Sequence, residues 1–163
     1  MTHSQLSEMK DKELEVVQGS VYNLSQLNNL EEMVKEYNAT TNKDLTYDDS
    51  KPFDMNVYFY AEKCGQILTF YVKDKYNNCY GFGIVRLVFN IHIACIEGAV
   101  ESIYVTPIAR KLGKGKELLD AMFAKAKEFG CKCIELSAPY GSRLERVYMR
   151  KFEPKDTTFF HVL

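Results

Sequence analysis

Residues 103–119 of this chain read IYVTPIARKLGKGKELL. An apolar strand ends at Thr106-Pro107, because proline cannot donate a hydrogen bond to a β-ladder. A basic turn with two glycines follows and opens an amphipathic helix, whose first turn presents unpaired amide hydrogens and the positive end of its dipole. Gly113 and Gly115 have no Cβ and let an anion approach this backbone closely. The stretch therefore predicts a phosphate-binding turn at 110–115.

Two other phosphate-binding motifs do not fit this turn. A dinucleotide fingerprint needs a third glycine where Leu118 stands, and a Walker A loop needs Gly-Lys followed by Ser or Thr, whereas Gly115-Lys116 precedes Glu117. The remaining alternative is a helix start that carries two glycines and three bases without any ligand.

Working outward, the chain is predicted to form one mixed α/β domain over 13–163, preceded by a loose polar segment at 1–12. The central sheet is expected to be mostly antiparallel, with a right-handed parallel β-α-β unit across 99–137. The N-cap of the first helix is expected at Ser25, and the strand 133–136 is expected to be buried. The predicted strands are 13–21, 67–73, 79–92, 94–105, 133–136 and 157–162; the predicted helices are 25–37, 52–63, 114–129 and 142–150; 38–51 is predicted to be a loop.

Composition narrows the class of protein. The 163 residues are 46% hydrophobic and 26% charged, as in ordinary globular domains. No 18-residue apolar run and no signal peptide are present, so we expect a cytoplasmic protein without a membrane span. Five cysteines, an odd number, indicate reduced thiols, and Cys131 and Cys133 are interpreted as small apolar residues rather than as a zinc pair.

Charge is unevenly distributed along the chain. The net charge of −1 gives no indication of nucleic-acid binding. Residues 31–54 hold seven acids and three bases, a net −4, whereas 106–155 hold twelve bases and six acids, a net +6. We expect an anionic ligand near the second half and a cationic one near the first, with the acidic stretch 44–54 attracting an amine.

In this setting, Arg110-Lys111-Leu112-Gly113-Lys114-Gly115 resembles the acyl-CoA pyrophosphate loop of the GNAT (GCN5-related N-acetyltransferase) family. The resemblance covers roughly 67–163 and extends more weakly over 13–66. It implies the GNAT fold, acetyl-CoA as co-substrate, no metal, and a strand 102–105 that splays from 133–136 so that the pantetheine arm pairs in the cleft. The implied cofactor-binding residues are Ile103, Tyr104, Val105, Arg110, Lys111, Leu112, Gly113, Lys114, Gly115 and Lys116, with the amide of Val105 polarising the thioester carbonyl.

Tyr148 carries a second resemblance, since Val147 to Phe152 is similar to the family segment whose tyrosine protonates the departing thiolate. A phenol holds its proton at neutral pH and can act as a general acid. The alternative is a core aromatic residue on an amphipathic helix. Two departures affect this region: Lys151 precedes Phe152 where the family often has glycine, and Gly141 or Ser142 occupies the place of an asparagine.

The expected general base is Glu101, four residues before Val105. Period-two alternation would put Glu101, Ile103 and Val105 on one face of the strand, with the carboxylate desolvated near the splay. The alternative is an exposed glutamate at the strand edge. Glu97 and His92 are weaker candidates for the base, and His92 fits a structural role better.

Together these residues predict an enzyme that moves an acyl group from acetyl-CoA to a primary amine in a ternary complex. The acceptor is expected to be a cationic amine of a small molecule or protein, and the enzyme a monomer or homodimer. Two alternatives stay open: a CoA-binding sensor or interaction module without turnover, and a purely structural α/β domain.

Overall fold

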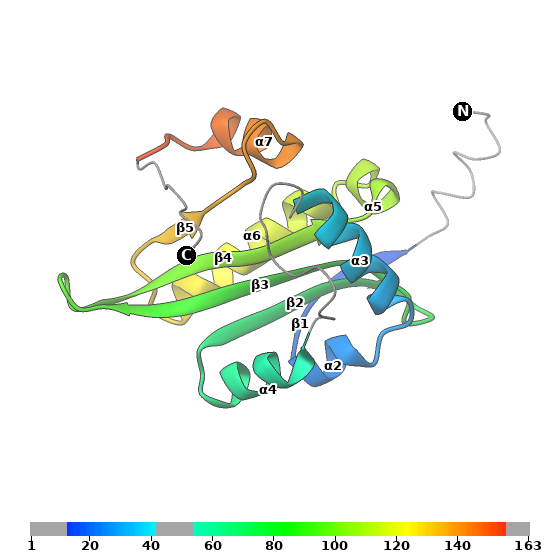
Figure 1. The fold of residues 1–163 in the computed structure, drawn as a ribbon, viewed down its shortest axis with the longest axis horizontal. Helices are drawn as coiled ribbons and strands as arrows, with labels where there is room; N and C mark the ends of the chain where they lie inside the picture. Colours follow the sequence, from blue (N-terminus) through cyan, green and yellow to red (C-terminus); the bar gives the residue numbers. More distant parts are fainter. Residues whose placement is uncertain (1–12, 42–53, 156–163) are drawn as a thin grey trace.

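A five-stranded mixed sheet forms the centre of the computed structural model, which describes residues 13–41 and 54–155 (Figure 1). The strands follow chain order; β1 to β4 pair antiparallel, and β5 pairs parallel with β4. The predicted fold class is thus confirmed. The strands are β1 (Leu14–Gly19), β2 (Ile67–Asp74), β3 (Cys79–Asn90), β4 (Cys95–Val105) and β5 (Ile134–Leu136). The helices are α2 (Val21–Ser25), α3 (Leu30–Thr41), α4 (Met55–Lys63), α5 (Pro107–Lys111), α6 (Lys114–Glu128) and α7 (Arg143–Lys151).

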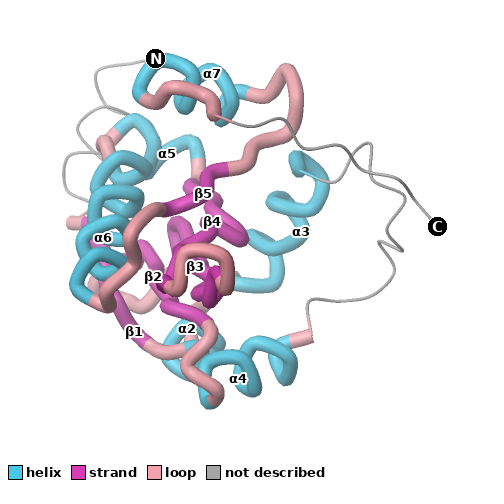
Figure 2. Tube along the Cα trace, turned by 90° about the vertical axis from the view of Figure 1, so that its left-hand side faces the viewer, coloured by secondary structure: helices cyan, strands magenta, loops and turns pink. Residues whose placement is uncertain are grey.

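Helix α6 covers one face of the sheet, as its apolar stripe predicts. Leu118, Leu119, Met122 and Ala126 are buried against the strands, and Gly130, with φ of 99°, follows the end of the helix. The other face is covered by α2, α3 and α4, so the sheet lies between two helical layers (Figure 2). A helix of 15 residues spans about 22 Å, so the two ends of α6 lie far apart.

The first helix is broken in two, and the predicted N-cap at Ser25 is wrong. Ser20 caps α2 through a reciprocal capping box with Asn23, and Ser25 is the last residue of that helix. The chain then turns at Asn29, where φ is +55°, before α3 begins. Asn29 makes two hydrogen bonds with the backbone of Cys79, 50 residues away, so a tertiary contact decides the break.

The β2–β3 turn that holds this contact is organised by Asp74, which is 6% exposed. Its carboxylate accepts hydrogen bonds from the amides of Tyr76 and Asn78, the Asn78 side chain and the Tyr80 hydroxyl. Burial by itself would raise the pKa of Asp74, but these hydrogen bonds outweigh it and leave the pKa below its usual value. The turn therefore depends on a charged carboxylate.

Other predicted boundaries shift slightly or fall outside the described residues. Helix α4 has Asp54 as its N-cap, two residues after the start expected at position 52. Strand β5 is not buried as predicted, because its three residues alternate between half-buried and exposed. The predicted strand at 157–162 and residues 42–51 of the predicted loop lie outside the described residues, whereas 38–41 continue helix α3, so the loop predicted there is wrong. Within the described ranges, none of the helices combines the length and apolar character that a membrane span requires.

Candidate active site

The outer edge of β4 is open over its last five residues. Strand β5 pairs only with Gly98, Ala99 and Val100, and among the described residues no strand pairs with 101–105 on that edge. The splay expected beside residues 102–105 is therefore present in the fold. It leaves backbone amides and carbonyls available to a ligand.

A β-bulge at Glu101 decides which amides face this opening. Ile84 pairs with Ser102 and Val85 with Val100, which leaves Glu101 as the extra residue in β4. Before the bulge the amide of Gly98 donates to Cys133 on the β5 side; after it the amide of Thr106 donates to Tyr80 on the β3 side. In a regular strand, the amides of all even-numbered residues point to the same side. Gly98 and Thr106 point to opposite sides, so the bulge has reversed the direction of the amides that follow it.

Counting back from Thr106, the amides of Val105 and Ile103 point away from β3, toward the open edge. The amide of Tyr104 points toward β3, and its side chain packs on the α3 side of the sheet. Two of the three predicted cofactor residues in β4 thus offer backbone donors to the opening, whereas Tyr104 faces the opposite side.

The predicted phosphate turn lies at the junction between two consecutive helices, α5 and α6. Thr106 caps the short helix α5, which the sequence did not predict although Thr-Pro is a frequent N-cap and N1 pair. Leu112 closes α5 and packs into the core, and Gly113, with φ of +76°, is the N-cap of α6. The amides of Lys114 and Gly115 have no backbone acceptor among the described residues, as expected for a first helical turn.

The charges around this turn are partly paired. Lys114 Nζ lies 2.6 Å from Glu117 Oε2, and Lys116 forms an ion pair with Asp120. Arg110 and Lys111 are exposed in the last turn of α5. A Cβ on Gly115 would lie 3.9 Å from Val105 Cγ2, so the first turn of α6 lies directly beside the end of β4.

Tyr148 of α7 lies in the same buried cluster as Val105 and is 8% exposed. No protein group among the described residues forms a hydrogen bond with its hydroxyl. Burial, and to a smaller extent the nearby Tyr37 phenol, raises the pKa of Tyr148 to about 12. The side chain is both a core aromatic residue and a buried donor without a partner, so the two predicted roles are compatible.

Glu101 does not lie where alternation predicted. Because of the bulge it does not share a face with Ile103 and Val105, which pack toward α6. Its carboxylate lies 2.8 Å from Arg86 Nε. The charge of Glu101, after burial, contributes to the raised pKa of Tyr58, which belongs to α4 on the opposite face of the sheet from α6. The predicted desolvation is also wrong, because the Glu101 side chain is 45% exposed.

Sequence reasoning missed Ser102, the residue after the bulge. Its hydroxyl is buried and has no hydrogen-bond partner among the described residues. It also missed that Tyr37, assigned only to an apolar stripe, meets Tyr104 across the sheet face. A serine inside a predicted strand was the only available signal, and it does not distinguish a ligand site from ordinary packing.

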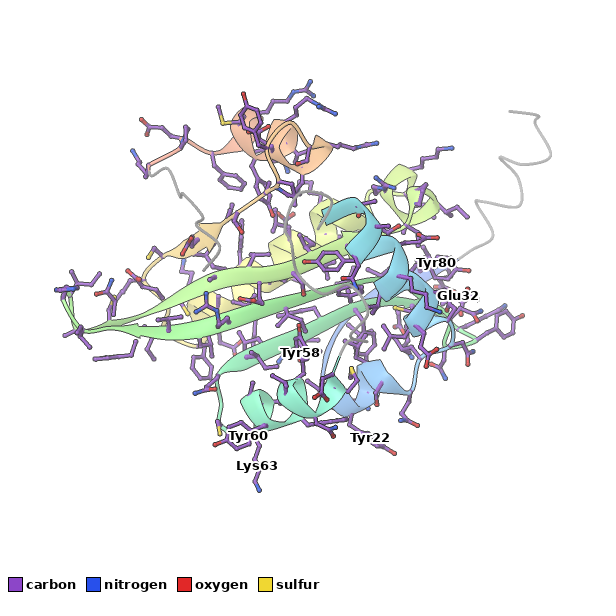
Figure 3. The ribbon with its side chains drawn as sticks, in the orientation of Figure 1. Tyr22, Glu32, Tyr58, Tyr60, Lys63 and Tyr80 are labelled. Atoms are coloured by element: carbon purple, nitrogen blue, oxygen red, sulfur yellow. The ribbon has the colours of Figure 1, made fainter. Side chains whose placement is uncertain are left out.

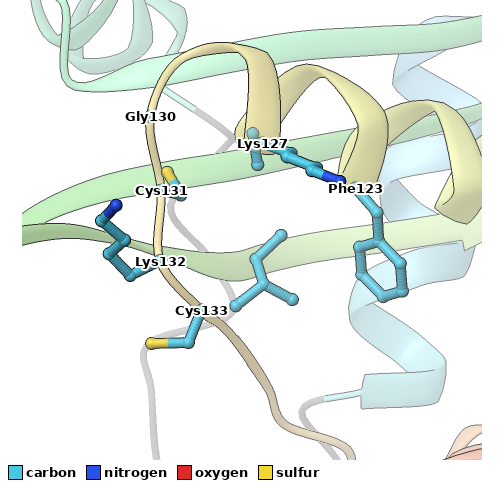
Figure 4. Close-up of a pocket in the computed structure, with 8 residues that line it drawn as sticks. Phe123, Lys127, Gly130, Cys131, Lys132 and Cys133 are labelled. Atoms are coloured by element: carbon cyan, nitrogen blue, oxygen red, sulfur yellow. The ribbon is translucent and has the colours of Figure 1, made fainter.

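A cavity lies elsewhere, at the far end of α6 from Gly113. It measures about 480 Å³ and is lined by Phe123, Lys127, Cys131 and Cys133, among others (Figure 4). Burial raises the pKa of both thiols, Cys131 and Cys133, so neither is an activated nucleophile. Cys133 is exposed, contrary to its interpretation as a buried apolar residue. Within 13–41 and 54–155, no group of three or more His, Cys, Asp or Glu side chains is placed to hold a metal ion.

The comparisons with known proteins that give a match indicate acetyltransferases. The profile of the acetyltransferase (GNAT) family matches residues 30–152. No curated protein gives a significant match. Solved structures match over nearly the whole chain at low sequence identity, which shows a shared fold.

Three of these structures illustrate the range. A ribosomal-protein-alanine N-acetyltransferase from Brucella melitensis is 16% identical over 93% of this chain and 99% of its own, with a TM-score of 0.68. Glucosamine-6-phosphate N-acetyltransferase from Arabidopsis thaliana is 13% identical over 93% and 99%, with a TM-score of 0.68. AAC(6')-Iy in complex with the bisubstrate analog CoA-S-monomethyl-acetylneamine is 16% identical over 93% and 98%, also with a TM-score of 0.68.

Proposed function

Because the chain belongs to the acetyltransferase (GNAT) family, we propose that it moves an acetyl group from acetyl-CoA to a primary amine in a ternary complex. The observation that carries this proposal is the open edge of β4, which ends beside the uncapped amides of α6. A bisubstrate complex of a structural neighbour joins CoA to an amine-derived acceptor, which supports acetyl-CoA as the donor. We include a cytoplasmic location in the proposal, since none of the five cysteines forms a disulfide.

The donor is held by backbone. Its pyrophosphate binds the amides of Lys114 and Gly115 at the positive end of the α6 dipole, with Arg110 and Lys111 adding charge. The pantetheine arm extends β4 as a strand would and pairs with its outward-facing groups at Ile103 and Val105. The thioester carbonyl then accepts the hydrogen bond of the Val105 amide, a donor of the kind that contributes about 3–4 kcal/mol in oxyanion holes.

The acceptor reaches the thioester from the face covered by α3 and α4, where Glu101 points. The amine nitrogen attacks the carbonyl carbon and forms a carbon–nitrogen bond. The amine loses its proton to the Glu101 carboxylate, directly or through water, and the carbon–sulfur bond breaks. Tyr148 donates a hydrogen bond to the departing sulfur, which takes a proton from water to become free CoA thiol, while Glu101 returns the proton of the amine to water.

The test is release of free CoA thiol from acetyl-CoA by the purified full chain, across a panel of amines and lysine peptides. The proposal expects amine-dependent release and an N-acetylated product by mass spectrometry. If acetyl-CoA binds with a measurable Kd but no amine or peptide stimulates release, the chain is a CoA-binding sensor instead. A saturating ligand at 100 times its Kd should stabilise the fold by about 2.7 kcal/mol, so absence of any thermal shift with CoA would exclude both functions.

A further inference from the structure

Three tyrosines gather on the sheet face where the acceptor approaches. Tyr37 comes from α3, Tyr58 from α4 and Tyr104 from β4, and all three belong to one packed cluster with Phe82. The ring centroids of Tyr37 and Tyr104 are 6.5 Å apart and nearly perpendicular. Figure 3 shows Tyr58 between α4 and the sheet, whereas Tyr60 projects away from it. The face therefore presents aromatic rings from three separate elements.

Two carboxylates complete this aromatic cluster. The Tyr104 hydroxyl donates to Glu36 Oε2 at 2.5 Å, which leaves the second oxygen of this exposed carboxylate available. Burial, followed by the charges of Glu101 and Tyr37, raises the pKa of Tyr58 to about 12, so Glu101 lies close to the Tyr58 phenol. Burial and Glu36 likewise raise the pKa of Tyr104 to about 12.

The cations that face the cluster lie at its margins. Arg86 forms an ion pair with Glu101, and the charge of Arg110 in α5 favours a lower pKa of Tyr104. Within 13–41 and 54–155, neither arginine forms an ion pair with Glu36, whose hydrogen bond to Tyr104 involves a neutral phenol. Glu101 therefore has a cationic partner that neutralises its charge, whereas the group that donates a hydrogen bond to Glu36 is neutral.

Two buried hydroxyls without partners border the same place. Tyr148 and Ser102 are 8% and 6% exposed, and no hydrogen bond to a described residue satisfies either hydroxyl. Burial, followed by Tyr37, raises the pKa of the Tyr148 phenol. Ser102 directly follows Glu101 in β4. A buried polar group without a partner destabilises the protein, and a polar substrate at this position would supply the partners.

We propose, resting on the acetyl transfer above, that this cluster is the binding site for an aliphatic amine with a second ammonium group, such as a diamine or polyamine. The reacting amine lies between Glu101 and Ser102, and the second ammonium group binds Glu36. The methylene chain lies against the rings of Tyr37 and Tyr104, which also attract the cation through their faces. Such cation–π contacts are favourable, and more so where the cation is shielded from water. A monoamine of the same length lacks the contact with Glu36.

The experiment compares 1,4-diaminobutane with butylamine as acceptors for the full chain, by release of CoA thiol. We expect kcat/KM to be at least about 10-fold higher for the diamine, equivalent to about 1.4 kcal/mol. Glu36→Gln should bring the ratio of the two amines close to one, mainly by raising KM for the diamine. The matched control is Glu31→Gln, an exposed glutamate of α3 about 140° around the helix from Glu36, which should keep the full ratio.

The outcomes separate this site from the general activity. Equal kcat/KM for both amines in the parent protein, or an equal loss for both in Glu36→Gln, overturns the diamine site while acetyl transfer stands. A lysine peptide or an aminoglycoside far superior to the diamine also overturns it. No release with any amine, despite binding of acetyl-CoA, removes the acetyl transfer itself and the diamine site with it.

Discussion

Replacing Tyr148 by phenylalanine should separate the chemical role of its hydroxyl from its packing. The pKa of about 12 means that the phenol stays protonated at neutral pH. Full proton transfer to a thiolate whose acid has a pKa of about 8.5 is uphill by about 3.5 units, or about 5 kcal/mol. The hydroxyl therefore acts chiefly as a hydrogen-bond donor to the developing negative charge. Bonds of that kind are worth about 1.5–3 kcal/mol.

Tyr148→Phe should accordingly lower kcat by about 10- to 150-fold with a small change in KM for acetyl-CoA. Stability should not fall, because the removed hydroxyl has no protein partner among the described residues. Removing a buried unsatisfied hydroxyl is neutral or stabilising, and each kcal/mol moves Tm by about 2–4 °C in a domain of this size. The assays are steady-state thiol release and thermal unfolding.

The matched control is Tyr140→Phe, since Tyr140 is 98% exposed in the loop before α7. This variant should match the parent protein in both assays. A change of less than about threefold in kcat for Tyr148→Phe would refute the role of a donor to sulfur. A fall in Tm of several degrees would show instead that the hydroxyl supports the fold.

Three further predictions concern the cofactor turn and the titrating residues. Gly115→Ala should leave stability unchanged, because its Cβ meets only Val105 Cγ2 at 3.9 Å, but the methyl group should project toward the pyrophosphate and raise the calorimetric Kd for CoA at least about 10-fold. Gly113→Ala should raise this Kd and also destabilise the fold by about 1 kcal/mol, because φ at this position is +76°. An unchanged Kd in both variants would contradict the proposed CoA site. The low pKa of Asp74 stabilises the fold at neutral pH, and this contribution should be lost as the pH falls below the ordinary value of 3.8, so Asp74→Asn should flatten the acid limb of a denaturant titration followed across pH. Tyr58 and Tyr104 have pKa values raised from 10.0 to about 12, so the folded state favours the neutral phenols and stability should fall as the pH rises from 10 to 12. Tyrosinate absorbance should therefore appear at a higher pH in the native than in the unfolded chain, and titration at the same pH in both states would disprove the burial of these phenols.

The parts of the fold set by local sequence could be predicted. The stripe from Leu118 to Ala126 and the glycines around α6 follow from periodicity and backbone conformation, so that helix was predicted with nearly correct bounds. The break at Asn29 could not be, because it depends on hydrogen bonds to Cys79. A helical apolar pattern continues across residues 25–37 whether or not a distant turn interrupts it.

The same distinction applies to the candidate site. The predicted phosphate turn is contiguous in sequence, so its position at the start of α6 could be predicted, whereas the positions of Glu101 and Tyr37 depend on tertiary structure. Period-two counting assigned Glu101 to the wrong face, because no residue type in 95–105 signals that one position is extra. Tyr37 meets Tyr104 only after α3 packs on the sheet.

The bulge at Glu101 has a consequence for engineering. The donors at Ile103 and Val105 are main-chain groups, so side-chain exchange along β4 would preserve them, whereas straightening the bulge with residue 101 kept in the ladder would shift 102–105 by one position and turn these amides toward β3. A designer who transplants this open edge to another sheet must therefore reproduce the bulge itself, because the same amino-acid sequence in a regular strand would place a different set of amides on the open edge.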